Sequence, residues 1–179
     1  MLITFSMLNW FLGFGALVLE VGALLLLVLF FLRHKNEVAG EIVAFFRTFA
    51  LWIGFLLVLI SMSMSLYYSE VLGFKPCGLC WSIRVFSYPL VFLFALALWK
   101  KDTSIADYVI TLSIPGAIVS LYQHYLQMGG AEFINCSTVS VGTDCAERFF
   151  FAWGHITFPW IAFTLFVFLV VLMIIVRRK

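Results

Sequence analysis

Four long apolar segments constrain this chain more than any other feature. They cover Leu8–Leu32, Val43–Tyr67, Ile105–Leu126 and Ile156–Val176. Each is long enough to cross about 30 Å of hydrocarbon, which takes about 20 helical residues. Of the 179 residues, 64% are hydrophobic and 11% are charged, whereas a soluble domain carries about 25% charged residues. A chain with so little polar surface is expected to have lipid as its solvent.

A fifth segment, Ser82–Trp99, is shorter and begins beside Arg84. The long side chain of Arg84 can reach the membrane interface, so we also count this segment as a span. Continuous apolar runs favour helices over a β-barrel, whose strands would alternate apolar and polar residues. We therefore predict an all-α integral membrane protein with five transmembrane helices and no separate soluble domain.

The basic residues predict the orientation of these helices. In a five-helix zigzag, eight of the eleven fall at one end: Arg33, Lys35, Arg47, Lys100, Lys101, Arg177, Arg178 and Lys179. Lys75, Arg84 and Arg148 fall at the other end. Loops on the cytoplasmic side are enriched in Lys and Arg. We therefore expect a multi-pass membrane protein with a cytoplasmic C-terminus and an extracytoplasmic N-terminus. No basic run suits a nucleic acid.

Two cysteines, Cys77 and Cys80, stand two residues apart in "KPCGLCWSIRVFSYPL". A Cys-x-x-Cys pair cycles readily between dithiol and disulfide. We expect a helix to begin near Cys80, where the positive end of its dipole favours a thiolate. Arg84 follows one turn later, and its permanent cation is placed to stabilise that thiolate or a neighbouring anion. An interfacial anchor is the competing interpretation of Arg84.

The second pair, Cys136 and Cys145, lies in the longest loop, at about residues 127–155. Small and polar residues separate these two cysteines, so we expect an exposed disulfide that another protein can reach. A structural staple of the loop is the alternative. Both cysteine pairs fall on the predicted extracytoplasmic side, where disulfides form and persist.

Two dithiols on the outer side of a membrane protein favour an electron relay. A partner would reduce the loop pair, which would pass two electrons to Cys77 and Cys80. A lipid-soluble quinone is the natural two-electron acceptor at the membrane edge. A zinc site with four thiolates is an alternative, although zinc pairs usually have short spacings on both sides. We expect no metal.

These motifs together resemble a known family. "PCGLCWSIRVFSYPL", then "HYLQ" at His124–Gln127, a cysteine pair and "FFFAWGHITFPWIAF" resemble the DsbB/BdbC thiol:quinone oxidoreductases over roughly Val43–Val176. The resemblance implies a protein of the bacterial plasma membrane with a four-helix redox domain at residues 43–179. It also implies re-oxidation of a DsbA-like thioredoxin-fold partner, with ubiquinone or menaquinone as the cofactor that takes the electrons.

The resemblance also implies roles for the four cysteines. Cys136 would be attacked by the reduced partner and form a mixed disulfide. Cys145 would then be released and exchange with Cys77. Cys80 would be the cysteine nearest the quinone.

Two further residues match the quinone site of the family. Arg84 corresponds to its arginine, and His124 to a histidine just before the long outer loop. For His124, an interfacial histidine with an ordinary hydrogen bond is the competing interpretation.

The chain departs from the family pattern in two ways. Residues 1–42 add an N-terminal transmembrane helix and a cytoplasmic link, and this helix carries Glu20 near mid-membrane. A carboxylate there is often functional. The alternative is a protonated Glu20 that hydrogen-bonds a neighbour such as the Ser61–Ser65 face. The loop between Cys136 and Cys145 is also short, and this leaves the order of disulfide exchange open.

Two other classes of protein stay open. One is a non-catalytic membrane protein with two structural disulfides. The other is a quinone enzyme similar to vitamin K epoxide reductase. In that family the Cys-x-x-Cys motif follows the loop pair, whereas here it comes first, so the order disfavours this class.

Overall fold

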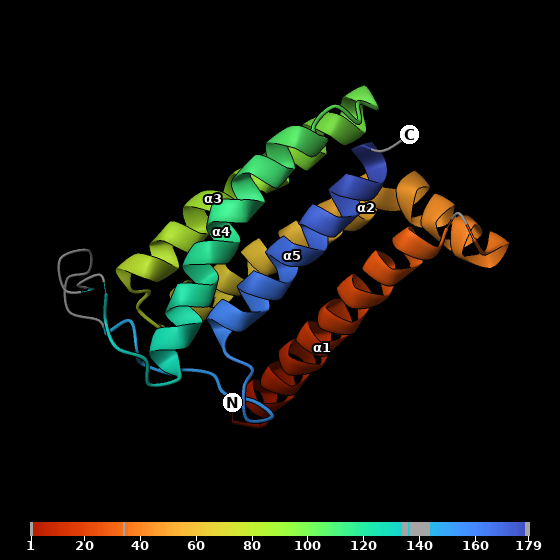
Figure 1. The fold of residues 1–179 in the computed structure, drawn as a ribbon. Helices are drawn as coiled ribbons and strands as arrows, with labels where there is room; N and C mark the ends of the chain where they lie inside the picture. The colour runs from red at the N-terminus through yellow and green to blue at the C-terminus, as the bar shows by residue number, and fades with distance from the viewer. Residues whose placement is uncertain (1, 34, 134–135, 137–143, 178–179) are drawn as a thin grey trace.

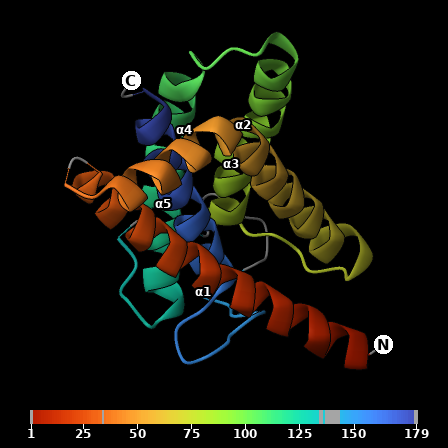
Figure 2. The same ribbon diagram turned by 90° about the vertical axis from the view of Figure 1, so that its right-hand side faces the viewer.

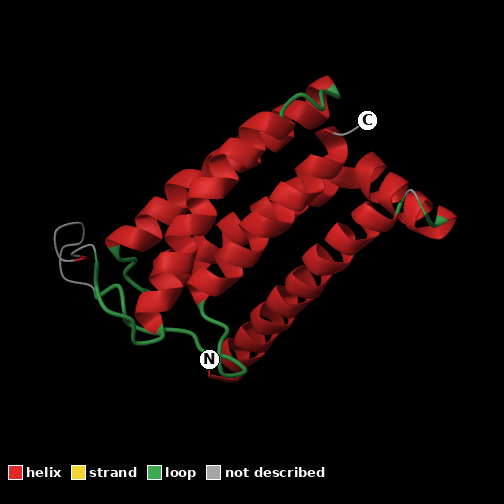
Figure 3. Ribbon diagram, in the orientation of Figure 1, coloured by secondary structure: helices red, strands yellow, loops and turns green. Residues whose placement is uncertain are grey.

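The computed structural model describes residues 2–33, 35–133, 136 and 144–177. Five α-helices follow one another: α1 (Leu2–Leu32), α2 (Glu37–Leu66), α3 (Gly78–Lys100), α4 (Ala106–Gln127) and α5 (Phe158–Arg177). A short π-helical segment, η1 (Tyr67–Val71), continues α2. Within the described ranges no strand forms, and Figure 3 shows helices joined by loops. The prediction of an all-α fold with five helices is confirmed.

The helix ends have local causes. The side chain of Asn36 accepts a hydrogen bond from the backbone N–H of Val38 at 3.0 Å and so caps α2. Cys77 plays the same part for α3, since its sulfur accepts from the N–H of Cys80 at 3.4 Å. The first cysteine of the motif is therefore also the N-cap of the helix that carries the second.

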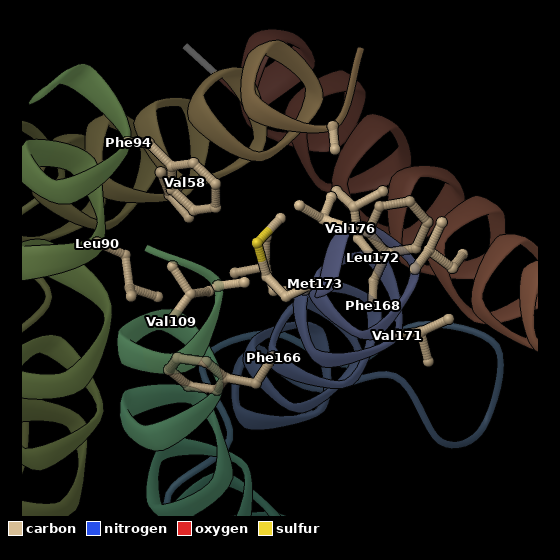
Figure 4. Close-up of a cluster of buried hydrophobic side chains, with 14 of the residues drawn as sticks. Val58, Leu90, Phe94, Val109, Phe166, Phe168, Val171, Leu172, Met173 and Val176 are labelled. Carbon is tan, nitrogen blue, oxygen red and sulfur yellow. The ribbon is translucent and has the colours of Figure 1, made fainter. Parts of the chain in front are cut away.

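α5 forms the centre of the bundle. In Figure 1 it lies between α4 and α1, and Figure 2 shows the same packing from the side. Its buried residues, among them Phe166, Leu169, Leu172 and Met173, meet Phe94 of α3 and Val109 of α4 in one apolar core (Figure 4). The outer faces of the surrounding helices carry large exposed apolar side chains. Such faces suit lipid rather than water.

Four of the helical segments are long and apolar enough to cross a membrane: Asn9–Leu32, Glu37–Val71, Gly78–Lys100 and Phe158–Arg177. The prediction of a fifth such span at Ile105–Leu126 is not met, because α4 is too polar by composition. Its polar residues include Ser113, Ser120, Gln123 and Gln127, and all four are buried. At about 1.5 Å per residue, α4 is still about 33 Å long and runs beside α5 in Figure 1.

The chain ends and loops gather at two ends of the bundle (Figure 1). The N-terminus, the segment between η1 and α3, and the long loop before α5 share one end. The C-terminus and the α3–α4 link share the other. This arrangement agrees with the zigzag predicted from the basic residues, two of which, Arg178 and Lys179, lie outside the described residues.

Close helix packing in the core depends on small residues. A Cβ atom placed on Gly116 of α4 would lie 2.6 Å from the Phe166 ring of α5, whereas a Cβ on Gly15 of α1 would meet nothing within 4 Å. Phe166 is fully buried, so its ring has little room to move.

Substituting Gly116→Ala should therefore lower the free energy of unfolding by about 1–3 kcal/mol, the usual effect of overpacking. Gly15→Ala is the matched control and should leave stability unchanged or slightly higher, because alanine favours helix. Thermal unfolding of the purified protein in detergent measures both variants. Equal melting temperatures for the two would contradict the packing described here.

Candidate redox site

The Cys77 and Cys80 side chains lie together at the N-terminus of α3. Both are free thiols, and their sulfurs are 3.2 Å apart, with Cys77 donating its S–H to Cys80. Cys77 is buried, whereas Cys80 is partly exposed. The hydrogen bond to Cys80, together with burial, raises the pKa of the Cys77 thiol above its ordinary value. Cys77 is thus held in its protonated form.

The loop cysteines form a disulfide. Cys136 and Cys145 are bonded, with their Cα atoms 6.2 Å apart. Their exposed fractions are only 5% and 0%, so the prediction of an exposed disulfide is wrong. The reason is their packing: both lie in an apolar cluster with Cys77 and Leu126. The small and polar residues between them, 137–143, lie outside the described residues.

The two cysteine pairs meet at Cys77. The sulfurs of Cys77, Cys136 and Cys145 all lie within 4.8 Å of one another. Cys77 in turn contacts the Cys80 sulfur. All four sulfurs are therefore joined by short distances, although Cys136 follows Cys77 by 59 positions in the sequence. Three cysteine sulfurs this close together could suggest a metal site. Zinc, however, binds cysteines as thiolates, and the sulfurs of Cys136 and Cys145 are bonded to each other.

A glutamine that the sequence analysis did not single out binds both thiols. The Nε2 atom of Gln123 lies 3.2 Å from the Cys77 sulfur and 3.0 Å from the Cys80 sulfur. Gln123 belongs to α4 and is 1% exposed. The only sequence signal for it is its place on the buried polar face of α4, at helical spacing from Ser120 and Gln127.

Arg84 lies one turn beyond Cys80, as the sequence predicts, and is buried. Its Nε atom donates to the Ser65 hydroxyl, and its Nη2 atom donates to the Ser65 backbone carbonyl, both at 3.0 Å. The hydroxyl of Tyr88 also donates to Ser65 Oγ, at 3.2 Å. The guanidinium further lies 5.0 Å from the ring centre of Trp81. These bonds tie α3 to the end of α2 and fix the cation near the membrane edge.

His124 has different partners. Its Nδ1 atom lies 2.9 Å from the Thr157 hydroxyl, and its ring centre lies 4.7 Å from that of Trp160. These contacts are with the first turn of α5 and the residue before it, whereas the hydrogen bonds of Arg84 are with α2. The structure thus gathers the four cysteines as the sequence implies, but gives Arg84 and His124 separate surroundings.

Comparison with known proteins identifies the family. The family model described as disulfide bond formation protein DsbB matches residues 47–176. The chain belongs to the DsbB family. Disulfide bond formation protein C of Bacillus subtilis is 33% identical over 133 residues, which cover 74% of this chain and 96% of that protein. A probable disulfide formation protein C 1 of Bacillus anthracis is 36% identical over 115 residues, covering 64% of this chain and 82% of the relative. No solved structure matches the chain.

The DsbB match begins inside α2, so α1 precedes it. α1 carries Glu20, which does not bond the Ser61–Ser65 face as one interpretation predicted. Instead, the indole N–H of Trp160 in α5 donates to Glu20 Oε1, and His155 Nε2 lies 4.0 Å from the same oxygen. Glu20 therefore attaches α1 to α5.

The distances among the sulfurs lead to a cross-linking prediction. In the double variant Cys80→Ser with Cys136→Ser, only Cys77 and Cys145 remain, and mild oxidation should join them. Cys77→Ser with Cys136→Ser is the matched control, which leaves Cys80 and Cys145 and should cross-link more slowly, because Cys80 lies outside the three-sulfur group. Thiol labelling followed by mass spectrometry measures both. A slower reaction for Cys77 than for Cys80 would contradict the geometry.

Proposed function

We propose that this DsbB-family protein, a membrane disulfide oxidoreductase, re-oxidises a DsbA-like extracytoplasmic thiol protein and passes the electrons to a membrane quinone. One observation carries the proposal: the Cys77 sulfur lies within 4.8 Å of both loop sulfurs and hydrogen-bonds to Cys80. Electrons that enter at the loop disulfide thus have a continuous path to the start of α3. The bacterial relatives and the distribution of basic residues support a plasma membrane location with both cysteine pairs outside.

The first exchanges transfer the reducing equivalents inward. A partner thiolate attacks Cys136, the Cys136–Cys145 bond breaks, and a mixed disulfide forms while Cys145 leaves as a thiolate. Cys145 then attacks Cys77 of an oxidised Cys77–Cys80 pair and releases the Cys80 thiolate.

The remaining exchanges restore the loop. The second thiolate of the partner displaces Cys136, so the partner leaves as a disulfide. Cys136 then attacks Cys145, which frees Cys77 as a thiol. The outcome is a dithiol at Cys77 and Cys80 beside a restored disulfide between Cys136 and Cys145.

The residues around Cys80 suit a quinone chemically. Cys80 is the less buried member of its pair, the flat Trp81 side chain is 55% exposed beside it, and Arg84 supplies a permanent cation one turn away. A bound quinone would supply the two-electron acceptor and leave as the quinol with the two thiol protons. The guanidinium of Arg84 would hold a bound quinone by donating hydrogen bonds to one of its oxygens.

The contact between the two cysteine pairs weighs against a non-catalytic scaffold. Two structural disulfides would have no need to lie against each other, whereas the Cys77 sulfur lies within 4.8 Å of both loop sulfurs. Membership of the DsbB family also favours the thiol:quinone reaction over the alternative similar to vitamin K epoxide reductase.

The proposal predicts that the purified protein couples oxidation of a reduced DsbA-like protein to loss of quinone absorbance. Cys80→Ser should lower this rate to the uncatalysed background, because the pair can then no longer close its disulfide. A partner with its second cysteine replaced by serine should accumulate a mixed disulfide with Cys136. Quinone loss that proceeds unchanged in Cys80→Ser would refute the proposal.

A second prediction concerns Arg84. Arg84→Gln should raise the quinone concentration for half-maximal rate by roughly tenfold or more, the usual worth of a hydrogen bond to a charged group. Arg33→Gln makes the same change at the other end of the bundle and serves as the control. Quinone titrations at saturating partner measure both, with rates normalised to folded protein. Equal half-saturation values for the two variants would exclude Arg84 from quinone binding.

A further inference from the structure

The amide of Gln123 forms an almost equilateral triangle with the two thiols. Its Nε2 atom lies 3.2 Å from the Cys77 sulfur and 3.0 Å from the Cys80 sulfur, and the sulfurs are 3.2 Å apart. A primary amide carries two N–H groups on one nitrogen. One nitrogen can thus donate to both sulfurs at once, and Gln123 reaches them from α4, a different helix from the one that bears Cys80.

The donor end of the Gln123 side chain distinguishes it from its neighbour Gln127. The Oε1 atoms of both glutamines are buried and have no hydrogen-bond partner among the described residues. The amide nitrogen of Gln127 donates to a backbone carbonyl, that of Glu147. The partners of the Gln123 amide nitrogen are instead the two sulfurs of the Cys77–Cys80 pair.

The strength of the hydrogen bonds from Gln123 depends on whether the Cys77–Cys80 pair is a dithiol or a disulfide. A thiolate accepts hydrogen bonds far more strongly than a neutral disulfide sulfur, because charge-assisted bonds are the stronger ones. Gln123 donates without adding a net charge at the membrane edge. The charged and titratable groups that face Cys80 in the described part of the chain are Cys77, which donates its S–H, and Arg84 on the same helix.

We propose that Gln123 is a positioning residue of the Cys77–Cys80 pair, whose amide holds the two sulfurs together and stabilises the Cys80 thiolate relative to the disulfide. Stabilising the reduced form of a dithiol makes its disulfide the stronger oxidant. Gln123 thereby favours the movement of electrons from the loop pair toward Cys80. This consequence rests on the proposed function, whereas the effect on the thiols does not.

Gln123→Met tests the proposal, since methionine has a similar length and no N–H donor. Two readouts need neither quinone nor partner: the rate of Cys80 alkylation as a function of pH, and the dithiol–disulfide equilibrium in a glutathione buffer. We expect a thiolate fraction about tenfold lower at neutral pH, which moves the alkylation profile up by roughly one pH unit. The equilibrium should move about tenfold toward the disulfide, or about 30 mV to more negative potential.

Gln127→Met is the matched control. Gln127 lies one turn further along α4 and is likewise buried, but its amide donates to the Glu147 carbonyl at 2.9 Å instead of a sulfur. This variant should keep the wild-type alkylation profile and redox equilibrium, even if its melting temperature falls as far as that of Gln123→Met.

A second variant keeps the test decisive if Gln123→Met folds poorly. Gln123→Glu preserves the shape of the side chain, removes the amide donor and puts a carboxylate against the sulfurs. We expect the alkylation profile to move in the same direction as for methionine, because the donor is lost and a carboxylate beside the sulfurs disfavours the thiolate. A wild-type profile in Gln123→Glu, or in a folded Gln123→Met, overturns the proposal. Failure of the wild-type protein to reduce quinone would refute the proposed function and leave these readouts intact.

Discussion

The position of one sulfur atom, that of Cys77, organises this molecule. It caps α3, receives an N–H of Gln123, donates to Cys80 and lies within 4.8 Å of both loop sulfurs. Disulfide exchange needs direct contact between sulfurs, because the attacking thiolate must reach one atom of the bond it breaks. Two separate dithiols can therefore act as one relay only if an atom such as this one touches both.

The helix that supports the contacts of Cys77 is α4, whose composition is poorly suited to lipid. α4 buries Ser113, Ser120, Gln123 and Gln127, and its packing beside α5 and α3 shields these polar groups from hydrocarbon. Polar residues in such a place are expensive and often functional. The C-terminal part of the same face places Gln123 against the thiols. The polarity that makes α4 a poor membrane span therefore serves the site.

The sequence predicts most of the fold because lipid imposes a simple rule on composition. Apolar length located all five helices, and their ends mostly fall within a few residues of the prediction. The exceptions are the starts of α1 and α2, which lie at Leu2 and Glu37 instead of Leu8 and Val43. The cysteine spacing identified the dithiol. Burial of the loop disulfide could not be predicted, since Cys136 and Cys145 stand among small polar residues and are covered by Leu126 and Cys77 from distant segments. Gln123 and Ser65 were missed for the same reason: a single polar residue on a helix does not reveal what it faces. Glu20 was recognised as unusual, but its partner Trp160 lies 140 residues away.

The central claim is that reducing equivalents move from the loop pair to the pair at the start of α3. A single-turnover experiment tests it most directly. One equivalent of a reduced DsbA-like partner is added to fully oxidised protein without added quinone, the reaction is acid-quenched, and mass spectrometry locates the free thiols. The account predicts thiols at Cys77 and Cys80 with the Cys136–Cys145 disulfide restored. Free thiols that remain at Cys136 and Cys145 while the Cys77–Cys80 disulfide stays closed would contradict it.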